Sequence, residues 1–467
     1  MSELERLARQ GVLLALDQGA TNAECTIAEG EQLSLRVRMH ALEQIEEAIR
    51  RGAGIRVLKG NRAGSATTND MSAEGVSRMV GCALDLARIA SEDPFAGLPG
   101  PGDLARCSDD LGIYSKDVTE LNTEERVALA RAAEEAALQL DPRMVGSEGA
   151  TFGAYVGHHV FANSLEFCRS YRTTNCSLSV SAVARQNDGM QRDYYCSSSR
   201  SAAGLESPED VGRAAAGRAL RRLNPRRIVT QKAPVIFEPR AAGSLVGHLF
   251  NAVNGSNICR GMSFLGGRLG KKIASELLTL IDDSQIPGLL GTSPFDDEGV
   301  RGGRTIVIEN GVLNSYLLNT YSARRLGLKT TGNAKRGLAG SACVGHGNLF
   351  ITGPRPPAGH DSSGIVGFRQ AATDEFPPSL PPGLPDSLLV TGLVGRGVNT
   401  TTGDYSQGAV GFWVENAEIA YPVSDIVISG KLQQMLMDIE WIGSDLAFRS
   451  SLASPTLLVG RMMVAGR

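Results

Sequence analysis

Glycine is the residue that most limits what this chain can fold into. It occupies 55 of 467 positions and follows no period along the sequence, whereas average usage is about 7%. Because glycine tolerates backbone angles that other residues avoid, this excess favours many tight turns and strand corners. A collagen-like repeat or a flexible linker would concentrate or repeat its glycines, so neither fits.

In the first half of the chain, apolar residues recur in some segments with the spacing of a helix and in others with that of a strand. Helical spacing is expected for residues 3–18, for a segment that Ser72 caps and that ends near residue 89, and for residues 122–140. Strand-like alternation covers residues 23–27 and 33–37, and residues 54–58 and 64–68 are typical of a hairpin. Residues 145–200 are rich in Thr, Ser, Val and Tyr, which favour strands. These patterns predict an α+β fold with antiparallel strands.

The second half is expected to be mostly β. Ser207 and Pro208 open a helix to about residue 223, a strand follows over 228–237, and Pro239 precedes a helix over 241–253. Short strands with glycine-rich turns come next, then a Pro/Gly-rich loop over 352–384 and a late helix over 431–439. We therefore expect an N-terminal α+β domain over 1–205 and a β-rich C-terminal domain over 206–467.

Charge and cysteine patterns exclude several classes of protein. The net charge is −3, and the five arginines between positions 218 and 227 fit a charged helix end better than a basic stripe, so no nucleic-acid partner is expected. No apolar run reaches the roughly 18 residues of a membrane span, and the acidic N-terminus does not resemble a signal peptide. The eight cysteines lack C-x-x-C spacing. A cytoplasmic protein with free thiols and no membrane contact is expected.

An ordered set of motifs resembles the TldD/PmbA family. The set comprises Ser-Pro-Phe-Asp-Asp-Glu-Gly at 293–299, the strand at 304–311, Gly-Val-Asn-Thr-Thr-Thr-Gly-Asp-Tyr-Ser at 397–406 and Gly-Phe-Trp-Val-Glu-Asn at 411–416. Weaker matches lie at 54–57, 64–70 and 169–172, so the resemblance covers most of the chain. Taken singly, the acidic residues 296–298 fit a solvated turn, and 309–311 and 415–416 fit hairpin turns.

The resemblance locates a metal motif that this chain lacks. The TldD-type catalytic subunit carries H-E-x-x-x-H on a helix, with a downstream cysteine, to hold zinc. Here Gly243 and Ser244 replace the first histidine and the glutamate, only His248 is retained, and no cysteine follows Cys343. The chain is therefore similar to the PmbA (TldE) type of subunit, without catalytic residues and without a metal of its own. His248 remains open to three interpretations: a helix histidine bonded to a carbonyl, a residue lining a peptide cavity, or a ligand of a shared metal.

By this resemblance, the chain is the non-catalytic subunit of a heterodimeric zinc metalloprotease. The TldD-type partner would carry the zinc, and the substrates would be unfolded peptides such as leader peptides or antitoxin-like proteins. Motif position suggests a set of peptide-cavity residues, which could equally be turn formers: His248, Arg396, Asn399, Asp404 and Tyr405. Two alternatives stay open, namely an autonomous homodimeric peptidase of divergent mechanism and a non-enzymatic modulator of DNA gyrase. A homodimer in isolation is compatible with any of them.

Overall fold

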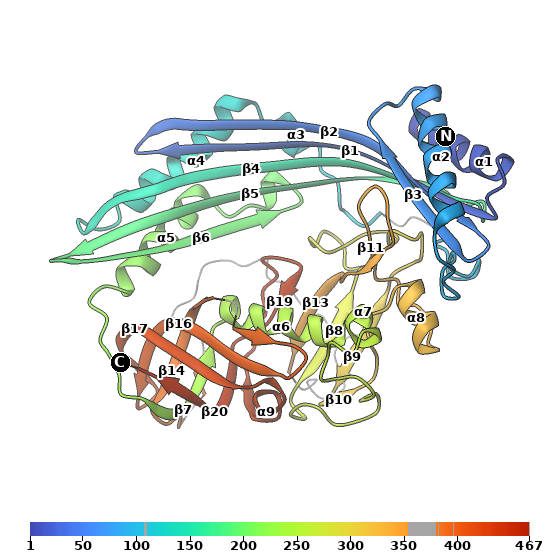
Figure 1. Ribbon diagram of the computed structural model, residues 1–467. Coiled ribbons are helices and arrows are strands. Elements are labelled where there is room, and N and C mark those ends of the chain that lie inside the picture. Colours follow the sequence, from blue (N-terminus) through green and yellow to red (C-terminus); the bar gives the residue numbers. More distant parts are fainter. Residues whose placement is uncertain (107–109, 354–379, 382, 396, 467) are drawn as a thin grey trace.

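A long antiparallel sheet forms the N-terminal part of the molecule. The computed structural model describes the chain except residues 107–109, 354–379, 382, 396 and 467. The sheet order is β3-β2-β1-β4-β5-β6, and Figure 1 shows that it is strongly curved. Its strands are β1 (Asn22–Arg38), β2 (Ala41–Lys59), β3 (Arg62–Thr68), β4 (Met144–Asn163), β5 (Cys168–Gln186) and β6 (Gly189–Ser199).

Two groups of helices cover this sheet. At one end, α1 (Glu3–Asp17) and α2 (Ala73–Ile89) pack on β1 and β2. At the other, α4 (Thr123–Leu138) and α5 (Pro208–Arg221) pack on β4 and β5, with the short α3 (Asp117–Glu120) and a 3-10 turn (Ala202–Gly204) beside them. Side chains of Ser72, Asn122 and Ser207 accept hydrogen bonds at the starts of α2, α4 and α5, as the sequence predicts.

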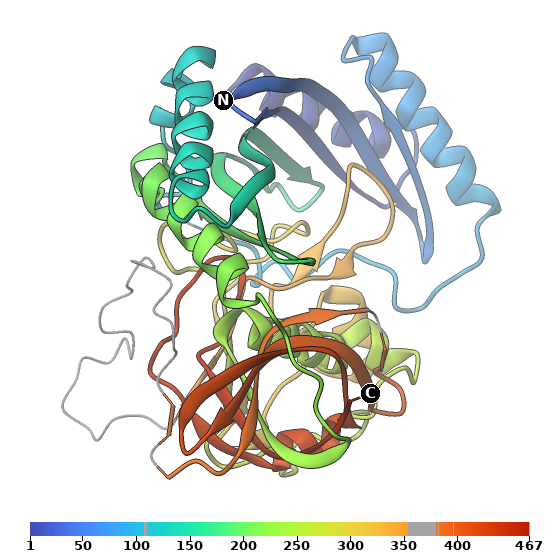
Figure 2. The same cartoon turned by 90° about the vertical axis from the view of Figure 1, so that its left-hand side faces the viewer.

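The C-terminal part is built around a closed ring of strands. Strand order is β14-β7-β20-β17-β16, and β16 pairs with both β17 and β14, which closes the ring seen in Figure 2. β14 and β7 run parallel, and the other ring pairs are antiparallel. The elements are β7 (Gln231–Phe237), β14 (Ser387–Val394), β15 (Val398–Asn399), β16 (Asp404–Glu415), β17 (Glu418–Lys431), α9 (Leu432–Met437), β18 (Ile439–Ile442) and β20 (Leu457–Ala465).

A smaller sheet joins this ring to the N-terminal part. Its order is β10-β9-β8-β13-β19, and a hairpin of β11 and β12 extends from it towards the long sheet (Figure 1). The elements are α6 (Pro239–Val253), α7 (Gly255–Cys259), β8 (Thr279–Asp283), β9 (Arg304–Glu309), β10 (Val312–Leu313), α8 (Thr320–Leu326), β11 (Ala334–Lys335), β12 (Cys343–Val344), β13 (Asn348–Thr352) and β19 (Leu452–Ala453). The largest apolar core lies between α6, this sheet and the ring.

The α+β class with antiparallel sheets is confirmed. Because α5 packs against β5 and β6, residues 208–221 belong spatially to the long sheet; the boundary between residues 205 and 206 stays a prediction. The late helix is shorter than expected, since α9 ends at Met437 and Ile439 already begins β18. Most of the expected loop at 352–384 lies outside the described residues. In the described part of the chain, no helix is long and apolar enough to cross a membrane.

Candidate functional site

Helix α6 contains the segment that the sequence singles out. Pro239 occupies its first turn, where a missing N–H costs nothing, and the helix follows directly from strand β7. One side is apolar and buried in the largest core, with Leu245, Val246 and Leu249. The opposite side is lined by half-buried residues, and it packs against β19: Gly243, Ser244, Gly247, His248 and Phe250.

His248 meets the aromatic ring of Tyr405. The two ring centroids lie 6.0 Å apart in an edge-on arrangement, so α6 and β16 are joined at this point. Burial lowers the pKa of His248, which keeps its imidazole neutral at pH 7. The carbonyl hydrogen bond considered for His248 does not occur among the described residues, and the imidazole instead makes the edge-on contact with Tyr405. The family motifs at α6 and at β16 therefore converge in space.

Tyr405 is an unusual residue to find in this position. It is only 1% exposed, yet its hydroxyl has no hydrogen-bond partner among the described residues. Burial raises its pKa well above the usual range. A buried hydroxyl without a partner is costly, on the order of 1–3 kcal/mol, so its presence calls for an explanation.

The other expected cavity residues lie in a turn. Asn399 accepts hydrogen bonds at Oδ1 from the backbone N–H groups of Thr401 and Thr402, at 2.9 and 3.3 Å. Asp404 forms an ion pair with Lys431 Nζ at 2.6 Å, and the hydrogen bond to Lys431 lowers the pKa of this exposed carboxyl. Both residues shape the β15–β16 turn, which agrees with the turn-forming alternative. Arg396 lies outside the described residues.

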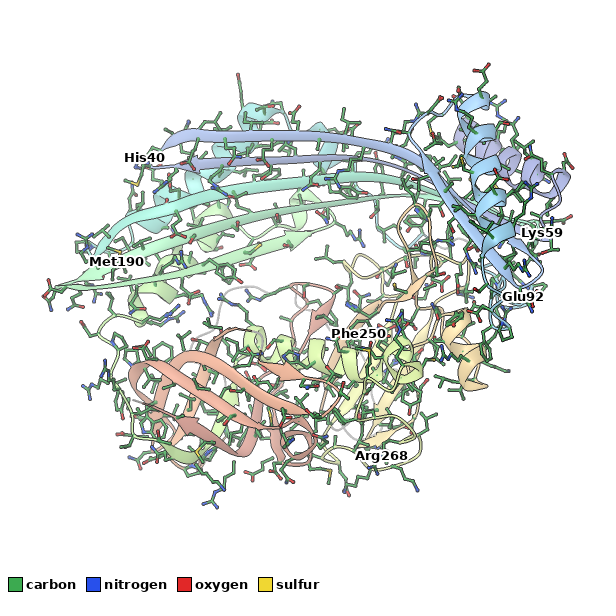
Figure 3. All side chains as sticks on the ribbon, viewed as in Figure 1. His40, Lys59, Glu92, Met190, Phe250 and Arg268 are labelled. Carbon is green, nitrogen blue, oxygen red and sulfur yellow. The ribbon has the colours of Figure 1, made fainter. Side chains whose placement is uncertain are left out.

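The residues on α6 do not fit a catalytic zinc ion. At the two replaced positions, Gly243 has no side chain and Ser244 Oγ donates a hydrogen bond to the carbonyl of Ala241, at 2.6 Å. Catalytic zinc takes three protein ligands, usually imidazole, carboxylate or thiolate. Across the part of the chain that is described, no three His, Cys, Asp or Glu side chains are grouped as a metal would need. The ring of His346 contacts Phe250 of α6 edge-on, with the ring centroids 4.8 Å apart (Figure 3 labels Phe250).

Sequence reasoning missed a buried charged cluster where the two parts of the chain meet. The acidic motif at 296–298 is not a solvated turn: Asp296 is 3%, Asp297 8% and Glu298 4% exposed. Asp296 accepts hydrogen bonds from the N–H groups of Glu298, Val300 and Ala334. The family motif therefore holds a tight, buried loop in place.

Arg336 ties this loop to the long sheet. Its guanidinium forms an ion pair with Glu24 of β1 and donates a hydrogen bond to the backbone carbonyl of Asp297 at 2.9 Å. The backbone N–H of Arg336 donates a second hydrogen bond, to Asp297 Oδ2 at 2.6 Å. Glu24 also pairs with Arg56 at 2.9 Å. One feature of the sequence could have revealed this cluster: Glu24 is an acidic residue inside the otherwise apolar strand predicted at 23–27.

Burial and nearby carboxylates perturb the pKa values in this cluster. Burial, with the neighbouring Glu298, raises the pKa of Asp296 to about 8. Asp282 of β8 lies outside this cluster and accepts hydrogen bonds from the side chain of Asn333 and the N–H of Gly347, and burial raises its pKa to about 7. The pKa of Glu24 is lowered because its two arginine partners outweigh the opposing effect of burial. The cluster thus combines an ionised Glu24 with a carboxyl, that of Asp296, that favours protonation.

Three family profiles match this chain. They are domain 1 of the PmbA/TldA metallopeptidases over residues 23–87, the central domain over 116–223 and the C-terminal domain over 230–466. The chain belongs to the PmbA/TldD family. The resemblance found in the sequence is thereby confirmed.

Members of the PmbA/TldD family resemble the chain over nearly its whole length. Metalloprotease PmbA of Escherichia coli O157:H7 is 38% identical over 95% of this chain and 92% of its own. A PmbA homologue of Haemophilus influenzae is 34% identical over 99% of this chain and 96% of its own. Among solved structures, a candidate modulator of DNA gyrase from Bacteroides thetaiotaomicron matches with a TM-score of 0.86 at 25% identity, covering 100% of both chains. TldE of Thermococcus kodakarensis, at 21% identity and a TM-score of 0.83 over 100% of both chains, shares the fold.

Proposed function

We propose that this chain is the non-catalytic subunit of a two-subunit zinc metalloprotease that processes or degrades unfolded peptides. The zinc would lie on a TldD-type partner, and this chain would hold the peptide and complete the cavity. One observation carries the proposal. The helix that bears the zinc motif in the catalytic subunit type has Gly243 and Ser244 here, and its single imidazole, His248, contacts the ring of Tyr405 edge-on.

The chemistry of this pair suits peptide binding better than hydrolysis. A neutral imidazole and a phenol hydroxyl can each donate to or accept from a peptide group. Tyr405 is 1% exposed and its hydroxyl has no described partner, so an internal water molecule would satisfy that group, and the half-buried His248 is the member of the pair that a peptide can reach. Asn399 and Asp404 are assigned to the adjoining turn, and they support the position of Tyr405 rather than contacting the peptide.

Two other functions compete with this proposal. An autonomous peptidase would need a nucleophile or a metal from residues other than those on α6. A gyrase modulator would bind protein without cleaving peptides. The structure from Bacteroides thetaiotaomicron bears the description of a candidate modulator of DNA gyrase. Among the described residues, no group of side chains supports either of these two functions.

The deciding experiment measures zinc content and cleavage of an unfolded peptide, for the chain alone and mixed with its zinc-bearing paralogue. We expect the chain alone to be metal-free and inert, and the mixture to cleave. His248→Ala should slow cleavage by the mixture without preventing association, whereas Arg213→Ala, on the exposed side of α5, should change neither. Stoichiometric zinc or chelator-sensitive cleavage by the chain alone would overturn the proposal. Binding to gyrase without cleavage in any mixture would favour the modulator.

A further inference from the structure

The side of α6 that carries His248 begins at Arg240, in the first turn of the helix. Ser244 and His248 follow Arg240 at intervals of four residues, so all three lie on one side of the helix. Arg240 is exposed, and the other two are half-buried. Figure 1 shows α6 on the side of the C-terminal part that faces the long sheet. Arg240 is therefore placed to reach from the helix of the candidate site to that sheet.

Arg240 contacts three groups on strand β6 of the long sheet. Its Nη1 donates a hydrogen bond to the backbone carbonyl of Tyr194 at 2.9 Å, and its Nη2 pairs with Asp193 Oδ1 at 3.2 Å. The guanidinium also lies over the ring of Tyr194, 4.1 Å from the ring centroid. Because the guanidinium is planar and its N–H groups are fixed in direction, these contacts set both its position and its orientation.

Asp193 is held in place by the long sheet and its helix α5. It is 5% exposed, and its carboxylate also pairs with Arg222 at 3.3 Å and with Arg218 at 3.7 Å. Burial alone would raise the pKa of Asp193, but the three arginines and the N–H of Tyr194 lower it, so the carboxylate is ionised at pH 7. Since α5 packs against β6, Asp193 keeps its place whether or not Arg240 is present.

A second contact joins α5 to the start of α6. Arg218, whose side chain is 5% exposed, pairs with Glu238 and donates a hydrogen bond to the backbone carbonyl of Thr391 in β14 at 3.3 Å. Glu238 is the N-cap residue of α6, and its side chain makes no capping hydrogen bond but reaches Arg218 instead. The two contacts together hold the first turn of α6 against the long sheet.

We propose that Arg240 is a positioning residue for peptide binding, because its contacts with Asp193 and Tyr194 fix where His248 lies relative to the long sheet. The inference rests on the proposed function, since it takes the peptide to lie beside His248. Arg240 precedes His248 by eight residues, which is about 12 Å along the helix axis, so it acts on the imidazole through the helix. A helix released at its first turn tilts, and a displacement of about 1 Å at a binding group can cost about a hundredfold in rate.

Peptide kinetics of the mixture with the zinc-bearing paralogue test the proposal. Arg240→Met keeps the stem of the side chain but loses all three contacts. We expect a KM about tenfold higher for an unfolded peptide and a kcat within about twofold of the wild type, because the zinc lies on the other subunit. Arg240→Lys keeps the charge without the planar fork and should recover part of the loss, to a KM about threefold above the wild type.

Two control variants leave these contacts intact. Tyr194→Phe keeps both the ring under the guanidinium and the backbone carbonyl, so its KM should equal that of the wild type. Arg213→Met is the same substitution on the exposed side of α5, and it should change neither KM nor kcat. A KM that rises equally in Arg213→Met would overturn the proposal, since the effect would then be general to the loss of an arginine.

Hydrogen exchange in the chain alone separates positioning from a direct contact with the peptide. In Arg240→Met, the amides of residues 241–248 should exchange about threefold faster than in the wild type. Exchange elsewhere should stay the same, because Asp193 keeps Arg218 and Arg222, and circular dichroism verifies that the variant folds. A higher KM with unchanged exchange would mean that Arg240 binds the peptide itself, and it would overturn the proposal.

The outcomes also separate this inference from the proposed function. Faster exchange with an unchanged KM would show that Arg240 serves stability alone, which refutes its role in peptide binding while cleavage by the wild-type mixture upholds the proposed function. If the wild-type mixture does not cleave, the proposed function fails and the role of Arg240 in peptide binding fails with it. Exchange in the chain alone then still decides whether Arg240 holds α6 against the long sheet.

Discussion

Removing Arg336 should strongly destabilise the contact between the two parts of the chain. Its side chain is 2% exposed and pairs with Glu24, whose side chain is 1% exposed. In Arg336→Met, Glu24 keeps only Arg56, and the carbonyl of Asp297 loses a charged donor. Breaking a buried ion pair by removing one partner typically costs about 3–5 kcal/mol, because the remaining charge stays buried. We expect a loss of that size in the free energy of unfolding.

Guanidinium denaturation monitored by circular dichroism measures this cost. Arg213→Met is the matched control, because Arg213 is 59% exposed and its pair with Asp210 is solvated; it should cost under about 0.5 kcal/mol. In a Glu24→Gln background, Arg336→Met should cost less, because no buried carboxylate loses its partner. A cost below about 1 kcal/mol in the wild-type background would refute the reasoning, since it would mean that water or other groups already solvate Glu24. Equal costs in both backgrounds would refute the coupling.

Three further predictions concern pH and single substitutions. The pKa of Asp296 is raised from its usual value to about 8 in the folded state, so its stabilising effect is complete below the unfolded pKa and is lost as pH rises through the folded pKa. Stability should therefore fall from about pH 4 to about pH 8, by at most about 1.4 kcal/mol per pH unit, and level off above pH 8; a flat or rising profile over this range in urea titrations would contradict this. Gly54→Ala should displace the β11–β12 hairpin, because the new Cβ would lie 1.7 Å from the carbonyl oxygen of Leu338. Faster proteolysis within 336–342 would reveal the displacement, and Gly81→Ala in helix α2, where the new Cβ meets no neighbour, is the control that should leave proteolysis unchanged. Tyr405→Phe should leave the free energy of unfolding unchanged or slightly higher, because the hydroxyl that it removes has no described partner. Thermal unfolding measures this, and a decrease of more than about 1 kcal/mol in the free energy of unfolding would indicate that an ordered water or another group binds the hydroxyl.

Helix starts and tight hairpin turns could be predicted from the sequence, because they depend on the chemistry of a few neighbouring residues. Ser72, Asn122 and Ser207 each accept a hydrogen bond from the first turn of a helix, as capping residues do. Asn310 and Gly311 adopt positive φ values of 48° and 79° in the hairpin between β9 and β10, as the Asn-Gly pair predicts.

Features set by distant parts of the chain could not be read from the sequence. Residues 41–51 have helix-favouring composition, and pairing with β1 overrides it. The acidic motif at 296–298 is typical of a solvated turn, and its burial depends on Arg336 and on strand β1. Within the candidate site, family resemblance identified both His248 and Tyr405. Their contact, and the separate role of Asn399 and Asp404 in a turn, required the structure.

The pairing of Glu24 with Arg336 has a consequence for synthesis of the chain on the ribosome. The long sheet is complete once residue 199 of β6 has been made, but Arg336 and Leu338 follow more than a hundred residues later. At the usual 5–20 residues per second, that interval is roughly 7–27 s. Throughout it, Glu24 has only Arg56 as a partner, and the backbone of β2 at Gly54 is not yet covered by Leu338. The nascent N-terminal part is therefore exposed to chaperones and to other nascent chains at the surface that the hairpin later covers.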